Sequence, residues 1–267
     1  MKQRLDWLDS VKAFGIMLVY IVHCNIPGVN PHIYLFHMPL FFIISGYCWD
    51  AKKNSRITII DFAKKKYNSY IVPYFKICSI CLCIYGIPMS IINHGCSMDM
   101  IRQLCDYLFG IFIYSRGKVE WLPNCSPVWF LTCLFCAEIV FHWIMRQNKT
   151  LLYVLFAGLI GYACSCVGKV FPWNIDSAFT AIPFLYLGYM LKEYESLLMQ
   201  KINLIVLIPI SLVIFLNGVV LVDFDGNHYE NILLMYVEAS IVCIAILDVF
   251  KATGGGISVS SVERHCY

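Results

Sequence analysis

The feature that most constrains this chain is a series of long apolar runs, separated by short polar breaks. Each run has about 15–24 residues, close to the ~20 that a helix needs to cross a bilayer. Because the bilayer core has no water to satisfy backbone N–H and C=O groups, each run is expected to form a helix. The sequence therefore predicts an all-α fold, a polytopic transmembrane helical bundle of about eight spans. The predicted spans are 8–26, 33–50, 70–93, 127–146, 151–168, 174–191, 202–222 and 231–250.

The composition supports lipid as the solvent for much of this surface. Hydrophobic residues make up 60% of the chain and charged residues 14%, whereas soluble domains are about 45–50% apolar and about 25% charged. The 14 cysteines fall largely within apolar runs, where they act as small hydrophobic residues, and no zinc-type pairing is present. We expect no metal, and no nucleic-acid partner, because the basic residues follow the loops and do not form one stripe.

Lysine and arginine gather in alternate loops, such as the segments around Lys52 and Lys64. This bias predicts a multi-pass protein of the cell (inner or plasma) membrane with a cytoplasmic N-terminus. Loop 94–126 then faces outward, and its amphipathic stretch 98–114 is expected to form a surface helix. The same loop contains Cys96, Cys105 and Cys125, two of which can pair in an oxidising compartment.

Three ionisable residues lie in the first predicted span: Asp9, Lys12 and His23. Lys12 and His23 are separated by about three helical turns, so both lie on one face, roughly 16 Å apart. Asp9 is one turn before Lys12 and is expected to pair with it. The alternative interpretation is a lysine that reaches the membrane surface and an interfacial histidine.

A second histidine, His37, lies just inside the outer end of the second predicted span, where Pro39 loosens the helix. Its depth is similar to that of His23, so the two imidazoles are predicted to share one polar pocket. A neutral imidazole can take a proton from a hydroxyl group near neutral pH. The alternative is a hydrogen-bonded structural histidine.

Two further groups of polar residues belong to the inner loops and the fourth span. The run Lys64, Lys65 and Lys66 suits the phosphates of a nucleotide-like donor, or else signals topology and contacts anionic lipid. Glu138 and His142 lie one turn apart at membrane depth, where a carboxylate must be paired, protonated or turned toward a cavity. This pair also suits the proton relay of a transporter.

Two segments of the chain resemble a known family. RLDWLDSVKAFGIMLVYIVH and LFHMPLFFIISGY are similar to the start of the membrane acyltransferase-3 family, and within it to the fucose 4-O-acetylase-like branch. The later segments YIVPYF, VWFLTCLF and IPFLYLGYML fit the same pattern. The resemblance covers residues 4–192 well and is weaker beyond them.

The resemblance implies a membrane O-acyltransferase. Such an enzyme moves an acetyl or other short acyl group from cytoplasmic acyl-CoA, here acetyl-CoA, to a hydroxyl of an extracytoplasmic sugar or surface polysaccharide. It implies His23 as a catalytic residue and Lys12 and Lys64–Lys66 as the donor site. We expect His37 to be catalytic as well, either by orienting the reacting groups or by stabilising the oxyanion. Lys12 stands where the family has an arginine, so it keeps the charge but loses the bidentate fork.

Two other functions stay open at this point. One is a transporter or exporter of glycan intermediates, to which Glu138 and His142 would supply proton coupling. The other is an inactive remnant, because family bundles have more spans than this chain offers. Residues 1–250 are expected to form one acyltransferase-3-like domain, truncated from a larger family bundle, and residues 251–267 a polar, disordered tail.

Overall fold

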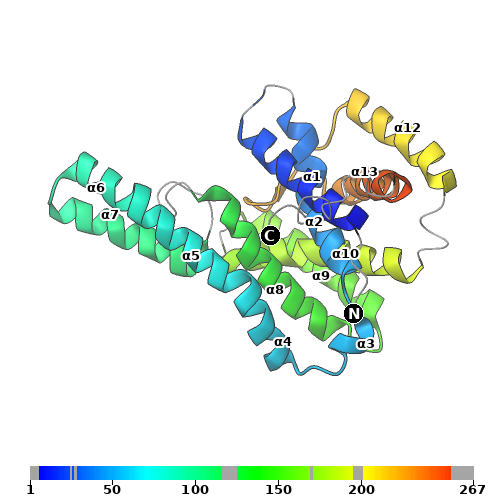
Figure 1. The fold of residues 1–267 in the computed structure, drawn as a ribbon, viewed down its shortest axis with the longest axis horizontal. Coiled ribbons are helices and arrows are strands. Elements are labelled where there is room, and N and C mark those ends of the chain that lie inside the picture. Colours follow the sequence, from blue (N-terminus) through cyan, green and yellow to red (C-terminus); the bar gives the residue numbers. More distant parts are fainter. Residues whose placement is uncertain are drawn as a thin grey trace, which may run out of the picture. The chain divides into compact units, whose positions relative to one another are not determined.

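The fold was analysed in a computed structural model, which describes residues 6–24, 26, 29–115, 125–168, 171–194 and 201–253. The described chain is mostly helical (Figure 1). Turns join the helices, and two short strands, β1 (Val222–Asp223) and β2 (His228–Tyr229), form one small ribbon. Each of the eight predicted spans coincides with a helix, and the predicted all-α membrane bundle is confirmed. These eight helices are α1 (Asp6–His23), α2 (Asn30–Tyr47), the rod Ile59–His94, α8 (Trp129–Ile144), α9 (Thr150–Val167), α10 (Ile175–Glu193), α12 (Lys201–Asn217) and α13 (Ile232–Ala252).

The chain forms two compact units, and neither is continuous in sequence. The first unit contains residues 1–49, 184–222 and 229–267, and the second contains residues 50–183 and 223–228. Helix α10 contributes to both, because the boundary falls at Pro183, in the middle of that helix. Each unit is described by itself below.

In the first unit α1, α2 and α13 pack against one another, and α12 packs along α13. Helix α2 also meets the second half of α10 at two glycines. A Cβ atom on Gly46 would overlap the carbonyl oxygen of Leu185, and one on Gly188 would overlap the carbonyl oxygen of Ile43. The two backbones therefore touch, as small residues allow in membrane helix pairs. The segments IISGY and YLGYM thus supply the two halves of one helix crossing.

In the second unit one long rod runs from Ile59 to His94. It consists of α4 (Ile59–Lys66), η1 (Tyr67–Ile71), α5 (Val72–Cys81), η2 (Leu82–Gly86) and α6 (Ile87–His94). The two π-helical segments each precede a proline, Pro73 and Pro88. Proline has no N–H and clashes with the carbonyl four residues earlier, and a locally wider turn removes both problems without ending the helix.

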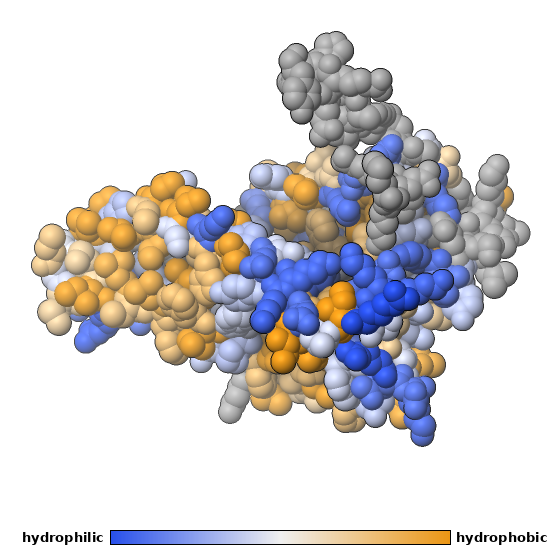
Figure 2. Space-filling view, turned by 60° about the horizontal axis from the view of Figure 1, so that its bottom comes forward, coloured by the Kyte–Doolittle hydropathy of each residue, from blue (hydrophilic) through white to orange (hydrophobic). Residues whose placement is uncertain are grey.

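The amphipathic stretch 98–114 is helical as predicted, with α7 (Met98–Phe109) continuing into η3 (Gly110–Tyr114). It folds back beside α6 and η2 and forms a helical hairpin with the rod. The hairpin is on the left in Figure 1, and the face of it that Figure 2 shows is mostly apolar. Its exposed side chains include Ile84, Ile92 and Phe109, as expected for helices solvated by lipid.

Length and composition alone mark three described helices as able to cross a membrane: Ile59–His94, Thr150–Val167 and Ile232–Ala252. Trp129–Ile144 and Ile205–Asn217 are apolar but shorter. The remaining short helices are α3 (Ala51–Asn54), η4 (Ser126–Val128) and η5 (Pro172–Asn174). Cys96, Cys105 and Cys125 are free thiols. The predicted tail lies outside the described residues from position 254 onward.

Candidate functional site

The two histidines singled out by the sequence lie in the first unit, on α1 and α2. His23 is the last residue of α1 and is exposed. The start of α2 is fixed to the end of α1, because the Asn30 side-chain amide donates to the Val22 carbonyl oxygen over 2.9 Å. The two helices therefore form a tight hairpin, and His37 lies two turns into its second arm.

His37 is buried, with only 6% of its surface exposed. Its Nδ1 lies 2.8 Å from the carbonyl oxygen of Ile33, one turn earlier in α2. Because a carbonyl can only accept, Nδ1 holds the proton and the Nε2 atom of the neutral ring has its lone pair available. The Tyr34 ring packs edge-on against the His37 imidazole at a centroid distance of 5.5 Å and restricts the orientation of the imidazole.

His23 and His37 lie toward the same end of the α1–α2 hairpin. His23 is the last residue of α1, and Asn30, the first residue of α2, is bonded to Val22. His37 follows Asn30 by about two helical turns. The structure thus places both predicted histidines near one end of this hairpin, one exposed and one buried.

Lys12 lies on α1 three turns below His23, roughly 16 Å along the axis. Its ammonium group is 3.0 Å from the Asp9 carboxylate, and both side chains are partly exposed. The Asp9–Lys12 pair predicted from the sequence is confirmed. An exposed ion pair of this kind is weak, so Lys12 can exchange Asp9 for a phosphate group at little cost.

In the second unit Lys66 turns inward, away from its two neighbours. Its ammonium group forms an ion pair with Glu138 of α8, and the two side chains are 19% and 2% exposed. The Tyr70 hydroxyl donates to the other Glu138 carboxylate oxygen over 3.0 Å. The rings of Phe62 and Tyr70 flank the ammonium group at 5.5 and 5.2 Å, which adds cation–π attraction.

Glu138 is therefore paired, as its depth in the membrane requires. His142, one turn further along α8, is also buried, and its ring stacks on Phe62 at a centroid distance of 4.3 Å and an angle of 8°. At the end of α8 the Arg146 guanidinium donates to the Ile57 carbonyl oxygen over 3.1 Å. These contacts attach α4 to α8 and give Glu138 and His142 packing partners within the second unit.

The predicted donor residues are not equivalent. Lys64 and Lys65 are exposed on α4, whereas Lys66 is engaged by Glu138. Lys64–Lys66 belong to the second unit and Lys12, His23 and His37 to the first. Sequence reasoning missed Tyr70 as a partner of Glu138. Its only signal was its position four residues after Lys66, on the same helix face.

A second polar cluster, also unforeseen, lies in the second unit. Ser115, Thr132 and Asn174 are fully buried, and the Ser115 hydroxyl contacts Thr132 at 2.8 Å and Asn174 at 3.1 Å. Ser115 and Asn174 have positive φ angles of 53° and 54°, a conformation that non-glycine residues rarely adopt. The hydrogen bonds hold these turns, which join η3 and η5 to α8.

The fold and these sites define a polytopic membrane protein whose first helical hairpin carries one exposed and one buried histidine. The family model described as an acyltransferase domain matches residues 5–262, nearly the whole chain. The chain belongs to the membrane acyltransferase-3 family and is a membrane acyltransferase. Comparison with curated proteins and with solved structures finds no match.

Proposed function

We propose that this membrane acyltransferase moves an acetyl or other short acyl group from acyl-CoA to a hydroxyl of an extracytoplasmic sugar. The observation on which the proposal depends is that exposed His23 and buried His37 lie toward one end of the α1–α2 hairpin, with the His37 Nε2 free of the proton held at Nδ1. The resemblance to the fucose 4-O-acetylase-like branch supports a carbohydrate acceptor.

In the proposed reaction His23 is the general base, because an acceptor can reach its exposed ring. The acceptor oxygen attacks the thioester carbonyl carbon while its proton passes to His23. The carbon–sulfur bond then breaks, its electron pair goes to sulfur, and the imidazolium returns the proton to give the free thiol of CoA. No covalent enzyme intermediate is required.

His37 is a positioning residue in this scheme. With Nδ1–H bound to the Ile33 carbonyl, its Nε2 can only accept a hydrogen bond while the ring is neutral. It can therefore hold the acceptor hydroxyl or the N–H of His23, but it cannot donate to the oxyanion of the transition state. The oxyanion-stabilising role that the sequence left open is not carried into the proposal.

The donor is proposed to be acetyl-CoA, which enters from the cytoplasmic side. Its phosphates would contact Lys12 of the first unit, whose ion pair with Asp9 is exposed. Lys64 and Lys65 are exposed on the second unit, and their contact with donor phosphates stays a separate prediction. Lys66 is left out of this set, because its charge is matched by Glu138. The roughly 16 Å between Lys12 and His23 suits the extended arm of the donor.

The test is substitution of the two histidines in the full chain, reconstituted in lipid. His23→Ala should lower acyl transfer by about 10²–10⁴-fold, the usual contribution of a general base. His37→Ala should lower it as well, and His37→Gln, which keeps a hydrogen-bond acceptor, should recover part of the loss. Acyl-ester content of the acceptor and release of CoA thiol measure both changes.

The matched control is His94→Ala, which removes an exposed histidine at the end of α6. This variant should transfer acyl groups at the normal rate. All variants should remain in the membrane fraction. His23→Ala and His94→Ala, which change exposed side chains, should keep the melting temperature of the parent chain, whereas His37→Ala should melt lower because it empties a buried site. Full activity in His23→Ala would remove that residue from the reaction.

A further inference from the structure

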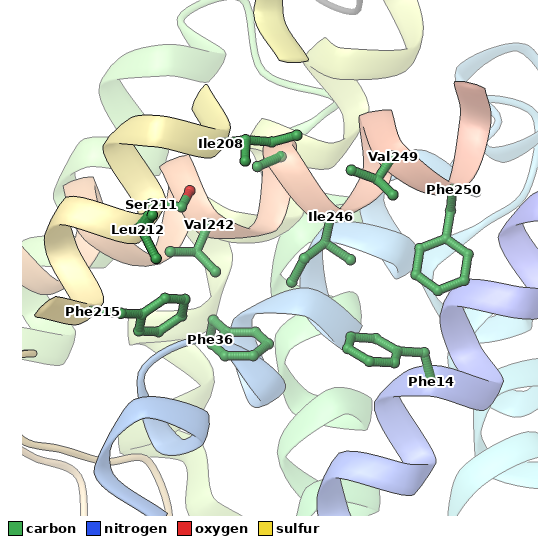
Figure 3. Close-up of a pocket in the computed structure, with 11 residues that line it drawn as sticks. Phe14, Phe36, Ile208, Ser211, Leu212, Phe215, Val242, Ile246, Val249 and Phe250 are labelled. Carbon is green, nitrogen blue, oxygen red and sulfur yellow. The ribbon is translucent and has the colours of Figure 1, made fainter. Parts of the chain in front are cut away.

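An apolar groove lies within the first unit, between α12 and α13, with residues of α1 and α2 at its floor (Figure 3). Its volume is about 440 Å³, within the range of small-molecule sites. One face of each long helix lines it: positions 208, 211, 212 and 215 of α12, and positions 242, 245, 246, 249 and 250 of α13. This spacing is that of a single helical stripe.

The walls of this groove accept hydrocarbon only. Ser211 is the one polar residue among those that line it. Its hydroxyl donates to the Leu207 carbonyl oxygen of its own helix over 2.8 Å. Any polar group placed deep in the groove would therefore lose its hydrogen bonds to water without replacement. The occupant must be an alkyl or isoprenoid chain.

One end of the groove lies beside His32, near the start of α2. At one end the Phe215 carbonyl oxygen accepts from His32 Nε2 over 3.2 Å, and the two rings are 5.6 Å apart. His32 lies at the start of α2, next to the end of α1 where His23 lies. Phe36 lines the floor and directly precedes His37. At the far end the Phe14 and Phe250 rings are 5.5 Å apart.

The groove is longer than a short acyl donor requires. The lining stretch of α13, from position 242 to position 250, is about 12 Å long at 1.5 Å per residue. An acetyl group needs room for only two carbons, so the donor's acyl group does not explain the groove.

We propose that the groove holds the hydrocarbon tail of a lipid-linked acceptor, so that its hydroxyl-bearing head lies at the histidine end. That the acceptor is a carbohydrate is taken from the proposed function. With a hydrocarbon tail in the groove, the acceptor class narrows to glycolipids. A bound tail holds the acceptor on the enzyme, so its hydroxyl does not have to reach His23 by diffusion through the membrane. Binding therefore raises the effective concentration of the hydroxyl beside His23.

The experiment uses the full chain in phospholipid nanodiscs and a dodecyl glucoside with a photoreactive diazirine at the end of its chain. After illumination, labelled residues are mapped by mass spectrometry. Label should concentrate on the groove faces of α12 and α13, and non-photoreactive dodecyl glucoside should compete it away. Phosphatidylcholine with the same diazirine chain serves as the probe for ordinary lipid contact.

A matched pair of variants on α12 tests the site. Leu212 lines the groove and Val213 does not, yet the two side chains are 56% and 54% exposed. Leu212→Trp should lower labelling about tenfold, because the indole overfills the groove. Val213→Trp should leave labelling unchanged.

The outcomes separate this proposal from the proposed function. Groove labelling that persists in His23→Ala supports the lipid site whether or not acyl transfer is lost. Equal labelling of both faces of α12, equal effects of the two tryptophan variants, or equal groove labelling by the phosphatidylcholine probe would each overturn the proposal. In those cases the groove is ordinary lipid-facing surface. The proposed role of His23 is then still decided by the acyl-transfer assay of His23→Ala.

Discussion

At the scale of single residues, burial decides which charged side chains need a partner. Glu138 is 2% exposed, and it has both the Lys66 ammonium group and the Tyr70 hydroxyl against its carboxylate. Lys12 and Asp9 are partly exposed, and their pair is an i,i+3 contact that water can screen. The same ion-pair chemistry is therefore structural in α8 and exchangeable in α1.

This difference predicts the behaviour of Glu138. Glu138→Gln leaves the Lys66 charge buried without its counter-charge, and should cost about 3 kcal/mol of stability. Removing both charges with Lys66→Met and Glu138→Leu should restore most of the loss, because no unpaired charge remains. Thermal unfolding in detergent of the parent chain, Glu138→Gln and the double variant measures how the stability effects of Lys66 and Glu138 depend on each other.

The matched comparison for the Glu138 variants is Asp9→Asn, which breaks the exposed ion pair on α1. It should change stability by about 0.5 kcal/mol or less. If the double variant of Lys66 and Glu138 is as unstable as Glu138→Gln alone, the ion pair is not what makes Glu138 important. A transport role for the carboxylate would then need a test of its own.

At the scale of helices, close backbone contact depends on two glycines far apart in the sequence. Gly46 of α2 and Gly188 of α10 each face a carbonyl oxygen of the opposite helix. A backbone atom cannot move aside as a flexible side chain can, so even one methyl group must separate the helices. This explains why glycine stands in the middle of each apolar segment.

Gly46→Ala and Gly188→Ala should each destabilise the protein by about 3 kcal/mol, the upper range for overpacking a core. Gly15→Ala is the matched control on α1. Its new Cβ would lie 2.8 Å from Phe41 Cζ, the far end of a side chain that can shift, so we expect about 1 kcal/mol or less. Melting temperatures in detergent give the order of stability of the three variants. A Gly15→Ala variant as unstable as the other two would contradict this prediction.

At the scale of the whole molecule, the distribution of lysine and arginine predicts the topology. A reporter fused at the N-terminus and one fused after Ala252 should both be cytoplasmic, because eight spans return the chain to its starting side. A reporter inserted at Gly226, in the turn between β1 and β2, should be extracytoplasmic. Reporters active only on one side of the membrane distinguish these locations, and opposite locations for the first two would exclude an even number of spans.

The sequence by itself determined the membrane fold, the positions of its eight helices and the pairing of Asp9 with Lys12. These features are local: a run of apolar residues, or a charge one turn from its partner, acts through the chain's own periodicity. The family segments likewise pointed to the two histidines before their surroundings were known.

Only the tertiary structure decided which distant side chains meet. Nothing local distinguishes Lys66, which reaches Glu138, from Lys64 and Lys65, which stay exposed. The groove likewise needs faces of four helices at once. Packing of segments far apart in sequence sets these contacts, and sequence patterns, which repeat every few residues, do not contain that information.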